Sequence, residues 1–348
     1  MKESLLGKTL EELQGVCAEL KLPKFTAKQI ADWIYKKGVS DIDSMSNLSL
    51  KAREVISEKY TVGLVPPLEE VSSEDGTYKY LYKYEEDTFV ETVMIPDKKR
   101  VTICVSTQAG CKMGCKFCAT GEQGYIRNLS AGEIINFVRS LPDFEDLSNI
   151  VYMGMGEPFD NYKEVVKSIE ILTSDWGFAM SPRRITVSTS GIIPQMIDFI
   201  YETQCHLAVS MHNPFHEERL NIMPIEKKYP IEDVCDEIRK HNWYGQRRVT
   251  FEYIVFKGKN DTYEHAKEIS YLLRGIETRV NLIRYHSTPE YDVEGANDEE
   301  MQRFQEELER FGLTTTIRAS RGEDILAACG LLSTKKISEN DNNISEDK

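Results

Sequence analysis

Three cysteines lie within eight residues, in the segment CKMGCKFC at 111–118. Cys111, Cys115 and Cys118 follow the spacing C-x-x-x-C-x-x-C, and no second C-x-x-C pair occurs in the chain. Structural zinc usually takes four ligands, so a zinc site here would need a remote fourth ligand. Closely spaced thiolates also hold iron–sulfur clusters. A cluster held by three cysteines leaves one iron open to bind a ligand and deliver an electron into it, and the spacing favours this chemistry.

Two further cysteines are not explained by an apolar setting. Cys104 lies in an expected strand just before the cysteine loop, and Cys329 follows the last expected strand, in RGEDILAACG at 321–330. The small neighbours of Cys329 would allow its loop to approach a substrate closely, so a thiolate there could act as a nucleophile. The alternative is an ordinary free thiol at a helix end. The other three cysteines fall in apolar stretches and are expected to be buried: Cys17, Cys205 and Cys235.

From about residue 100, strand patterns alternate with helix patterns. The strands are expected at 101–106, 149–154, 183–190, 206–212, 248–256, 278–285 and 314–320, and the helices at 130–141, 161–174, 194–203, 230–241, 261–275 and 298–312. This alternation predicts a parallel sheet, either doubly wound or barrel-like. Unusual residues follow the first four strands, and functional residues of a barrel gather at the carboxyl ends of its strands. The pattern therefore favours a full or partial barrel.

The segments after the second, third and fourth strands could hold a cofactor. GMGEP at 154–158 offers Glu157 and backbone carbonyls to an ammonium group, and its glycines allow close approach. Ser188 and Ser210 offer hydroxyls for a ribose or a carboxylate. For each serine alone, ordinary turn polarity is an equally good explanation, but their joint placement favours a cofactor. The dinucleotide fingerprint G-x-G-x-x-G is absent, because Phe159 stands at its sixth position.

Two smaller parts precede this region. Residues 1–60 are expected to form an all-helical unit, with Thr26 capping one helix and Ser49 opening another, either as a capping subdomain or as a surface for a partner. Residues 61–96 are expected to form a β-hairpin. Alternate tyrosines of the hairpin could stack on bases, but half-buried sheet packing is the commoner reason for such a stripe: Tyr78, Tyr80, Tyr82 and Tyr84.

Composition limits the function classes. The chain has 348 residues with a net charge of −14, which argues against broad, nonspecific nucleic-acid binding but leaves room for a local basic surface. No run of 18 apolar residues predicts a transmembrane helix, and the N-terminus lacks the apolar core of a secretory signal, so a cytoplasmic protein is expected. Eight cysteines in such a chain favour metal or thiol chemistry over structural disulfides. The acidic tail, 333–348, is expected to be disordered.

Four segments together resemble the RlmN-type radical S-adenosylmethionine (SAM) methyltransferases: CVSTQAGCKMGCKFCATGEQGYIRNL, GMGEP, STSG and RGEDILAACG. The resemblance covers nearly the whole chain. It implies a partial (β/α)6-type barrel at 97–332, an RNA-binding role for residues 1–60, and methylation of adenosine C2 in 23S ribosomal RNA and in the anticodon loop of transfer RNA. The related Cfr enzymes, which methylate adenosine C8, share the radical core and are the alternative.

The resemblance also implies a mechanism. Adenine C2 is electron-poor and will not attack the methyl group of SAM directly. Cys329 first takes a methyl group from one SAM. A 4Fe-4S cluster on Cys111, Cys115 and Cys118 then cleaves a second SAM to a radical, which removes hydrogen from the methylated Cys329. The carbon radical adds to C2, Glu91 accepts the proton, and Cys104 resolves the intermediate through a transient disulfide with Cys329.

The remaining implications concern binding. The family's SAM contacts fall on Gly156, Glu157, Ser188, Ser210, Met211 and His212, and a further position that is usually Asn falls on His286, which can still donate a hydrogen bond. A target adenosine would be flipped out of its RNA to enter the site. An electron donor such as flavodoxin, monomeric action and no membrane partner complete what the resemblance implies.

Overall fold

The protein is described here from a computed structural model, which covers residues 2–334 except 86–87, 142–143, 244–246 and 289–290. The expected disorder of the tail, 333–348, lies outside the described residues from 335 onward. At its first two residues the expectation is wrong, because the Ser333 amide donates to Glu91 and the buried Thr334 donates to Gln123. One sheet of ten strands organises the described chain, in the order β14-β13-β12-β11-β10-β9-β6-β5-β4-β3. Its parallel strands are β6 (Arg100–Cys104), β9 (Asn149–Tyr152), β10 (Ile185–Thr189), β11 (His206–Ser210), β12 (Val249–Val255), β13 (Thr278–Arg284) and β14 (Thr315–Ile317). The predicted α/β class is confirmed.

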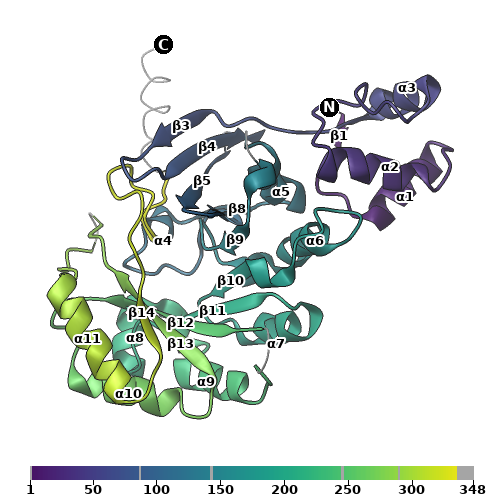
Figure 1. The fold of residues 1–348 in the computed structure, drawn as a ribbon. Coiled ribbons are helices and arrows are strands. Elements are labelled where there is room, and N and C mark those ends of the chain that lie inside the picture. Colours follow the sequence, from purple (N-terminus) through teal and green to yellow (C-terminus); the bar gives the residue numbers. More distant parts are fainter. Residues whose placement is uncertain (1, 86–87, 142–143, 244–246, 289–290, 335–348) are drawn as a thin grey trace.

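Amphipathic helices connect the parallel strands (Figure 1). Six of them match the predicted positions: α5 (Ala131–Arg139), α6 (Tyr162–Thr173), α7 (Ile193–Glu202), α9 (Ile231–Arg239), α10 (Tyr263–Leu272) and α11 (Asp298–Arg310). Two short helices, α4 (Ala119–Gln123) and α8 (His216–Ile222), were not predicted, because so few residues cannot display a helical repeat of apolar positions. Single 3-10 turns add η3 (Phe144–Asp146), η4 (Pro158–Asn161), η5 (Pro182–Arg184) and η6 (Pro224–Lys227).

The predicted hairpin extends the sheet beyond β6 as antiparallel strands. β5 (Thr88–Asp97) pairs with β6 and with β4 (Tyr78–Tyr84), and β3 (Glu69–Ser72) forms the edge. Tyr80 and Tyr82 are buried, and the Tyr82 ring lies 5.0 Å from the Phe137 ring of α5. These two tyrosines are therefore packing residues. Strand β3 was not predicted, because all four of its residues are exposed and show no apolar alternation.

The sheet does not close into a barrel, because β14 and β3 are its two edges. The segment after β14, residues 318–334, crosses this open side to the β3–β4 turn and is called the strap here (Figure 1). The Gly322 amide donates to the Asp75 carboxylate at 3.0 Å, and the Asp324 carboxylate accepts from the Glu74 amide at 3.2 Å. The strap therefore joins the two ends of the open sheet, and it carries Cys329.

The N-terminal unit lies to one side of the sheet (Figure 1). It contains α1 (Leu10–Glu19), α2 (Thr26–Ala31), the π-helix η1 (Asp32–Lys36) and α3 (Leu50–Lys59). The expectation of an all-helical unit is wrong in one respect, because β1 (Glu3–Ser4) pairs in parallel with β2 (Tyr60–Thr61). Thr26 is the first helical residue rather than the cap, and Phe25 stands at the cap position. Ser49 does cap α3, accepting from the Ala52 amide. No helix of the described chain is long and apolar enough to cross a membrane.

Candidate active site

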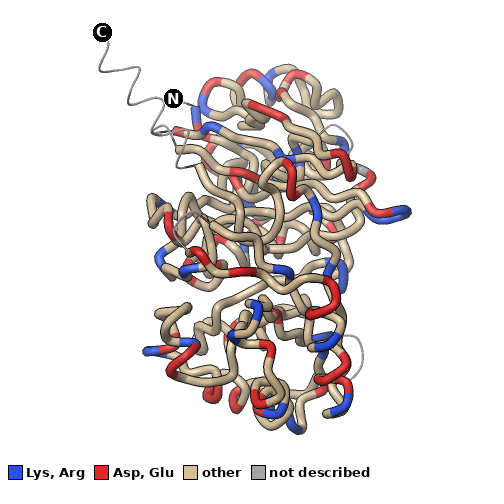
Figure 2. Tube along the Cα trace, turned by 90° about the vertical axis from the view of Figure 1, so that its left-hand side faces the viewer, with Lys and Arg blue, Asp and Glu red and all other residues tan. Residues whose placement is uncertain are grey.

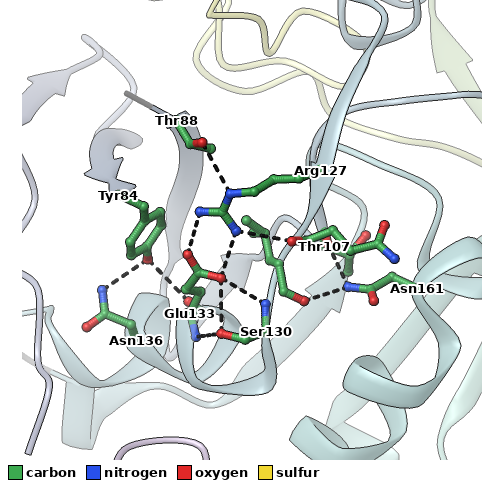
Figure 3. A network of polar contacts seen from close by, with 10 residues as sticks. Tyr84, Thr88, Thr107, Arg127, Ser130, Glu133, Asn136 and Asn161 are labelled. Atoms are coloured by element: carbon green, nitrogen blue, oxygen red, sulfur yellow. Dashed lines mark hydrogen bonds and ion pairs between the residues drawn. The ribbon is translucent and has the colours of Figure 1, made fainter. Parts of the chain in front are cut away.

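The cysteine loop is held at its base by two short strands. β7 (Gln108–Gly110) and β8 (Tyr125–Asn128) pair in antiparallel orientation on either side of residues 111–124. The Gln108 side-chain amide donates to the Asn128 side-chain oxygen at 2.8 Å. Just outside these strands, Asn161 Nδ2 donates to the carbonyls of Thr107 and Leu129 at 2.8 and 2.7 Å (Figure 3). The two ends of the loop are thus clamped together.

An ion pair between β8 and α5 also supports the base of the cysteine loop. The Arg127 guanidinium donates to both carboxylate oxygens of Glu133, at 2.7 and 3.0 Å, and to Thr88 of β5 at 3.2 Å (Figure 3). Glu133 also closes the capping box of α5 with Ser130. One arginine therefore connects β8, the start of α5 and the hairpin, so the cysteine loop is positioned by three elements at once.

The three cysteines of the loop line one pocket of about 160 Å³. Five of the predicted SAM contacts line the same pocket: Gly156, Glu157, Ser188, Ser210 and His212. Met211 does not line it; its side chain is buried, and its carbonyl accepts from Arg219 at 2.9 Å. The pocket therefore brings together thiols from one loop and polar groups from the ends of several strands.

The donors in this pocket suit an iron–sulfur cluster. Burial raises the pKa of Cys111 to about 12 and raises the pKa of Cys115 and Cys118, so bound iron is needed to make them thiolates. Among the residues that the structure describes, no three His, Cys, Asp or Glu side chains converge closely enough to hold a single metal ion. A cluster takes each thiolate on a different iron, and the three thiols that line this pocket fit such a cluster.

Glu157 is positioned by backbone amides at the strand ends. Its buried carboxylate accepts from the Ser190 amide at 2.8 Å and from the Phe159 amide at 3.0 Å. Burial raises the pKa of this carboxyl group, while the two amides lower it. Gly156 beside it has φ +98°, and a Cβ there would lie 2.6 Å from Gln108. The Ser190 hydroxyl lies in the same pocket, close to the Glu157 carboxylate.

His212 stays neutral in this pocket. Its Nδ1 accepts from the Ile254 amide at 3.0 Å, so the ring proton lies on Nε2. Burial, reinforced by the Arg219 charge, lowers the pKa of His212 to about 3. The Phe117 ring meets the His212 ring edge-on at 4.8 Å. His212 can therefore donate one hydrogen bond from Nε2 without carrying charge.

Arg219 of α8 is a positioning residue that sequence reasoning missed. Its fully buried guanidinium donates to the carbonyls of Ser190 and Ser210 at 2.9 and 2.8 Å, and it forms an ion pair with Glu226. It thereby holds the ends of β10 and β11, where the predicted SAM contacts lie. No motif in the sequence marks it, because α8 is too short to be predicted and an isolated Arg reads as solvated charge.

A second, larger pocket of about 450 Å³ adjoins the first. Cys104 lines the larger pocket, and Cys329 lines both. Burial, with the nearby Cys329, raises the pKa of Cys104 to about 12. The Cys329 side chain is exposed within the pocket. The surrounding protein atoms still exclude much of the water around its thiol and so raise its pKa, whereas the charge of Arg318 lowers that pKa. The structure therefore brings together the two thiols that the sequence separates by more than 200 residues.

Glu91 lies beneath the strap rather than at an edge of the sheet. It sits on β5, between β4 and β6, and is buried. One carboxylate oxygen is 3.0 Å from Lys79 Nζ, and the other accepts from the Ser333 amide at 3.0 Å. Burial raises the pKa of Glu91, and Lys79 and the Ser333 amide oppose that rise. The solvent-facing alternative is excluded, and its role as proton acceptor stays a prediction.

His286 lines the larger pocket. The other residues that were predicted to contact SAM and that line a pocket all line the smaller one. Its Nε2 lies 2.6 Å from the Ser320 hydroxyl of the strap. Its SAM contact therefore stays a prediction without support from its position. Among the remaining cysteines, Cys17, Cys205 and Cys235 are buried, as predicted.

Comparisons with known proteins agree with this arrangement. Family models match residues 105–269 as the Radical SAM superfamily and residues 3–62 as the ribosomal RNA large subunit methyltransferase N-terminal domain. The chain is 54% identical over 335 residues to a probable dual-specificity RNA methyltransferase RlmN of Phocaeicola vulgatus, covering 96% of each chain. It is 40% identical over 336 residues to the dual-specificity RNA methyltransferase RlmN of Syntrophus aciditrophicus, covering 95% of this chain and 96% of that one.

A solved structure agrees as well. The crystal structure of a radical SAM methyltransferase from Sphaerobacter thermophilus superposes with a TM-score of 0.89 and 38% identity, over 94% of this chain and 98% of that one. Family membership implies a 4Fe-4S cluster and SAM, which the donors of the smaller pocket fit. The chain belongs to the RlmN family of dual-specificity RNA methyltransferases, within the radical SAM superfamily.

Proposed function

We propose that the protein methylates C2 of adenosine in 23S ribosomal RNA and in transfer RNA, with Cys329 carrying the methyl group. The observation that supports this most is the place of Cys329, which lines both the smaller and the larger pocket. A methyl carrier must meet the methyl donor on one side and the RNA base on the other. Adenine C2 is electron-poor, so a reaction that begins at sulfur avoids a direct attack by the base on SAM.

The smaller pocket would hold the cofactors. Cys111, Cys115 and Cys118 would ligate the cluster, and Glu157 and the neutral His212 would face SAM. When bound, the cluster supplies the electron that cleaves SAM and so generates the radical needed to remove hydrogen from the S-methyl group. Arg219 would keep the strand ends in place during this chemistry.

The larger pocket would hold the base and the two thiols that finish the reaction. Glu91 itself lines neither pocket, but it lies on β5 two residues before Val93, which lines the larger one. Glu91 would accept the proton that leaves C2, after one of its two present contacts yields. Once the base adduct has given up one electron and the C2 proton, the Cys104 thiolate would attack the sulfur of Cys329. The bond between that sulfur and the transferred carbon then breaks, and the carbon takes up a proton to complete the methyl group. The resulting disulfide must be reduced by an external dithiol before the next turnover. Both thiols line the same pocket, as this step requires.

The test is the identity of the product. Ribosomal and transfer RNA lacking the modification are incubated with reconstituted protein, SAM and a reductant under anaerobic conditions, then digested to nucleosides. Chromatography with mass spectrometry separates 2-methyladenosine from 8-methyladenosine. We expect 2-methyladenosine from both RNAs. Finding 8-methyladenosine alone would refute the C2 assignment, and product from one RNA class only would restrict the substrate range.

A further inference from the structure

The larger pocket occupies the open side of the sheet. Alternate residues of β6 line it, from Arg100 through Thr102 to Cys104, because every second side chain of a strand points to the same face. The strap contributes Arg318, Arg321 and Cys329 to the lining of the same pocket. Arg100 and Cys104 are four strand residues apart, or about 13 Å along β6. The pocket thus extends along β6 from Cys104 to Arg100, and Arg321 lies near Arg100, because both arginines approach Asp97.

Four arginines line this pocket: Arg100, Arg284, Arg318 and Arg321. The chain as a whole is acidic, and Figure 2 shows basic and acidic residues interspersed along the trace rather than separated into faces. The four guanidinium groups therefore make this pocket locally basic in a chain that is acidic as a whole. Guanidinium groups bind phosphate oxygens well, because their planar fork donates two hydrogen bonds at once.

The carboxylates near these arginines leave some of their N–H groups available to another ligand. Arg321 reaches Asp97 only at 3.9 Å, beyond hydrogen-bond range, and Arg100 meets the same carboxylate at 3.0 Å. Arg284 pairs with Asp298. Each guanidinium has five N–H donors, so a single carboxylate leaves several for another anion. The Arg284 and Arg321 side chains are 30% and 34% exposed, so their charges are partly shielded from water and still reachable.

Arg318 differs from the other three. Its guanidinium lies 3.3 Å from Glu252 and lines both pockets, as Cys329 does. Its charge also acts on Cys104 and Cys329, lowering the pKa of both thiols. This arginine therefore faces the reacting end of the pocket, which leaves Arg100, Arg284 and Arg321 for the phosphates.

We propose that the larger pocket binds the target nucleotide of an RNA strand, with backbone phosphates on Arg100, Arg284 and Arg321 and the base beside Cys104 and Cys329. The assignment rests on the proposed function, because it identifies the ligand as RNA. It adds a phosphate-binding set of residues that no sequence motif marks. The three arginines contact backbone only, so they contribute affinity without choosing the base sequence.

The test measures binding of a labelled RNA stem-loop at several salt concentrations. Arg321→Ala should weaken binding about tenfold and Arg100→Ala about threefold, the scale of a partly shielded and an exposed charge contact. In each variant the slope of log affinity against log salt should fall by about 0.7, the value for one phosphate contact on a single strand. Arg321→Lys should keep the slope, because it keeps the charge.

The matched control is Arg310→Ala on α11. Arg310 is 69% exposed and pairs with Glu307 three residues earlier at 2.9 Å, much as Arg100 is 66% exposed and pairs with Asp97 at 3.0 Å. It does not line the pocket, so its removal should leave affinity and slope unchanged. Arg321→Gln serves as a second variant if Arg321→Ala does not fold.

Two outcomes would overturn the proposal. Unchanged affinity and slope in Arg100→Ala, Arg284→Ala and Arg321→Ala would show that phosphates bind elsewhere. An equal loss in Arg310→Ala would show that the effect is only the total charge of the chain. Because the assay measures binding alone, it remains informative if wild-type protein binds RNA yet makes no methyladenosine, a result that would break the proposed function instead.

Discussion

The cluster thiols and the Cys104–Cys329 pair reach neighbouring pockets by different routes. Cys111, Cys115 and Cys118 come from one short loop whose base is clamped by Asn161 and by the β7–β8 pair. Cys104 ends a strand, and Cys329 lies on the strap that crosses the open side of the sheet.

This difference matches what each set is proposed to do. A cluster must keep three thiolates in place through many turnovers, which a loop held at both ends favours. A methyl carrier must meet a cofactor, a base and a resolving thiol in succession. A side chain exposed toward two pockets on an irregular segment can make those contacts in turn.

The largest loss of activity is expected when a cysteine of the 111–118 loop is replaced. Cys115→Ala removes one proposed cluster ligand, so iron binding, SAM cleavage and RNA methylation should all be lost. Iron and sulfide analysis after anaerobic reconstitution, with a SAM cleavage assay, measures this. Cys235→Ala is the control, because Cys235 is a buried cysteine of α9 that lines neither pocket. Full iron content in Cys115→Ala would remove that cysteine from the ligand set.

The strap thiol should separate product formation from SAM cleavage. Cys329→Ala keeps the cluster ligands but removes the methyl acceptor, so SAM should still be cleaved under reducing conditions while no methylated RNA forms. Quantifying 5′-deoxyadenosine and methyladenosine in the same reaction measures both. Methylated RNA at the wild-type rate would refute the role of Cys329 as methyl carrier.

The strand thiol should affect only the last step. Cys104→Ala removes the nucleophile that would release the base from Cys329, so a covalent protein–RNA adduct through Cys329 should accumulate. Denaturing electrophoresis with labelled RNA detects the adduct, and peptide mass spectrometry locates it. The double variant Cys104→Ala/Cys329→Ala should form none. Free product at the wild-type rate from Cys104→Ala would mean that another group resolves the intermediate.

The smallest effect is a shift in pH dependence. Glu91 must be ionised to accept a proton, so methylation should fall as pH drops through its raised pKa. Lys79→Met removes a charge that lowers this pKa, so the acidic limb of the rate profile should move to higher pH. Lys79→Arg should restore the limb. Profiles of RNA methylation over pH measure the shift, and an unmoved limb in Lys79→Met would exclude Glu91 as the group that sets it.

Much of the fold was predictable because its signals are local. Each parallel strand of the described sheet begins within two residues of a predicted position, since buried β-branched runs bounded by helical repeats leave few alternatives. The exposed strand β3 and the short helices α4 and α8 were missed, because they carry no apolar period. Arg219, Arg284, Arg318 and Arg321 were missed for a related reason, since the function of a charged side chain depends on partners that are distant in sequence.

The sequence by itself determined the chemistry: three thiols at cluster spacing, two more outside it, and polar residues after successive strands. Only the tertiary structure decided that Cys329 lines both pockets, that Glu91 is buried against Lys79, and that His286 lies apart from the other predicted SAM side chains in the pockets. The physical reason is that ligand spacing is a property of one loop, whereas these contacts depend on how the strap crosses the open side of the sheet.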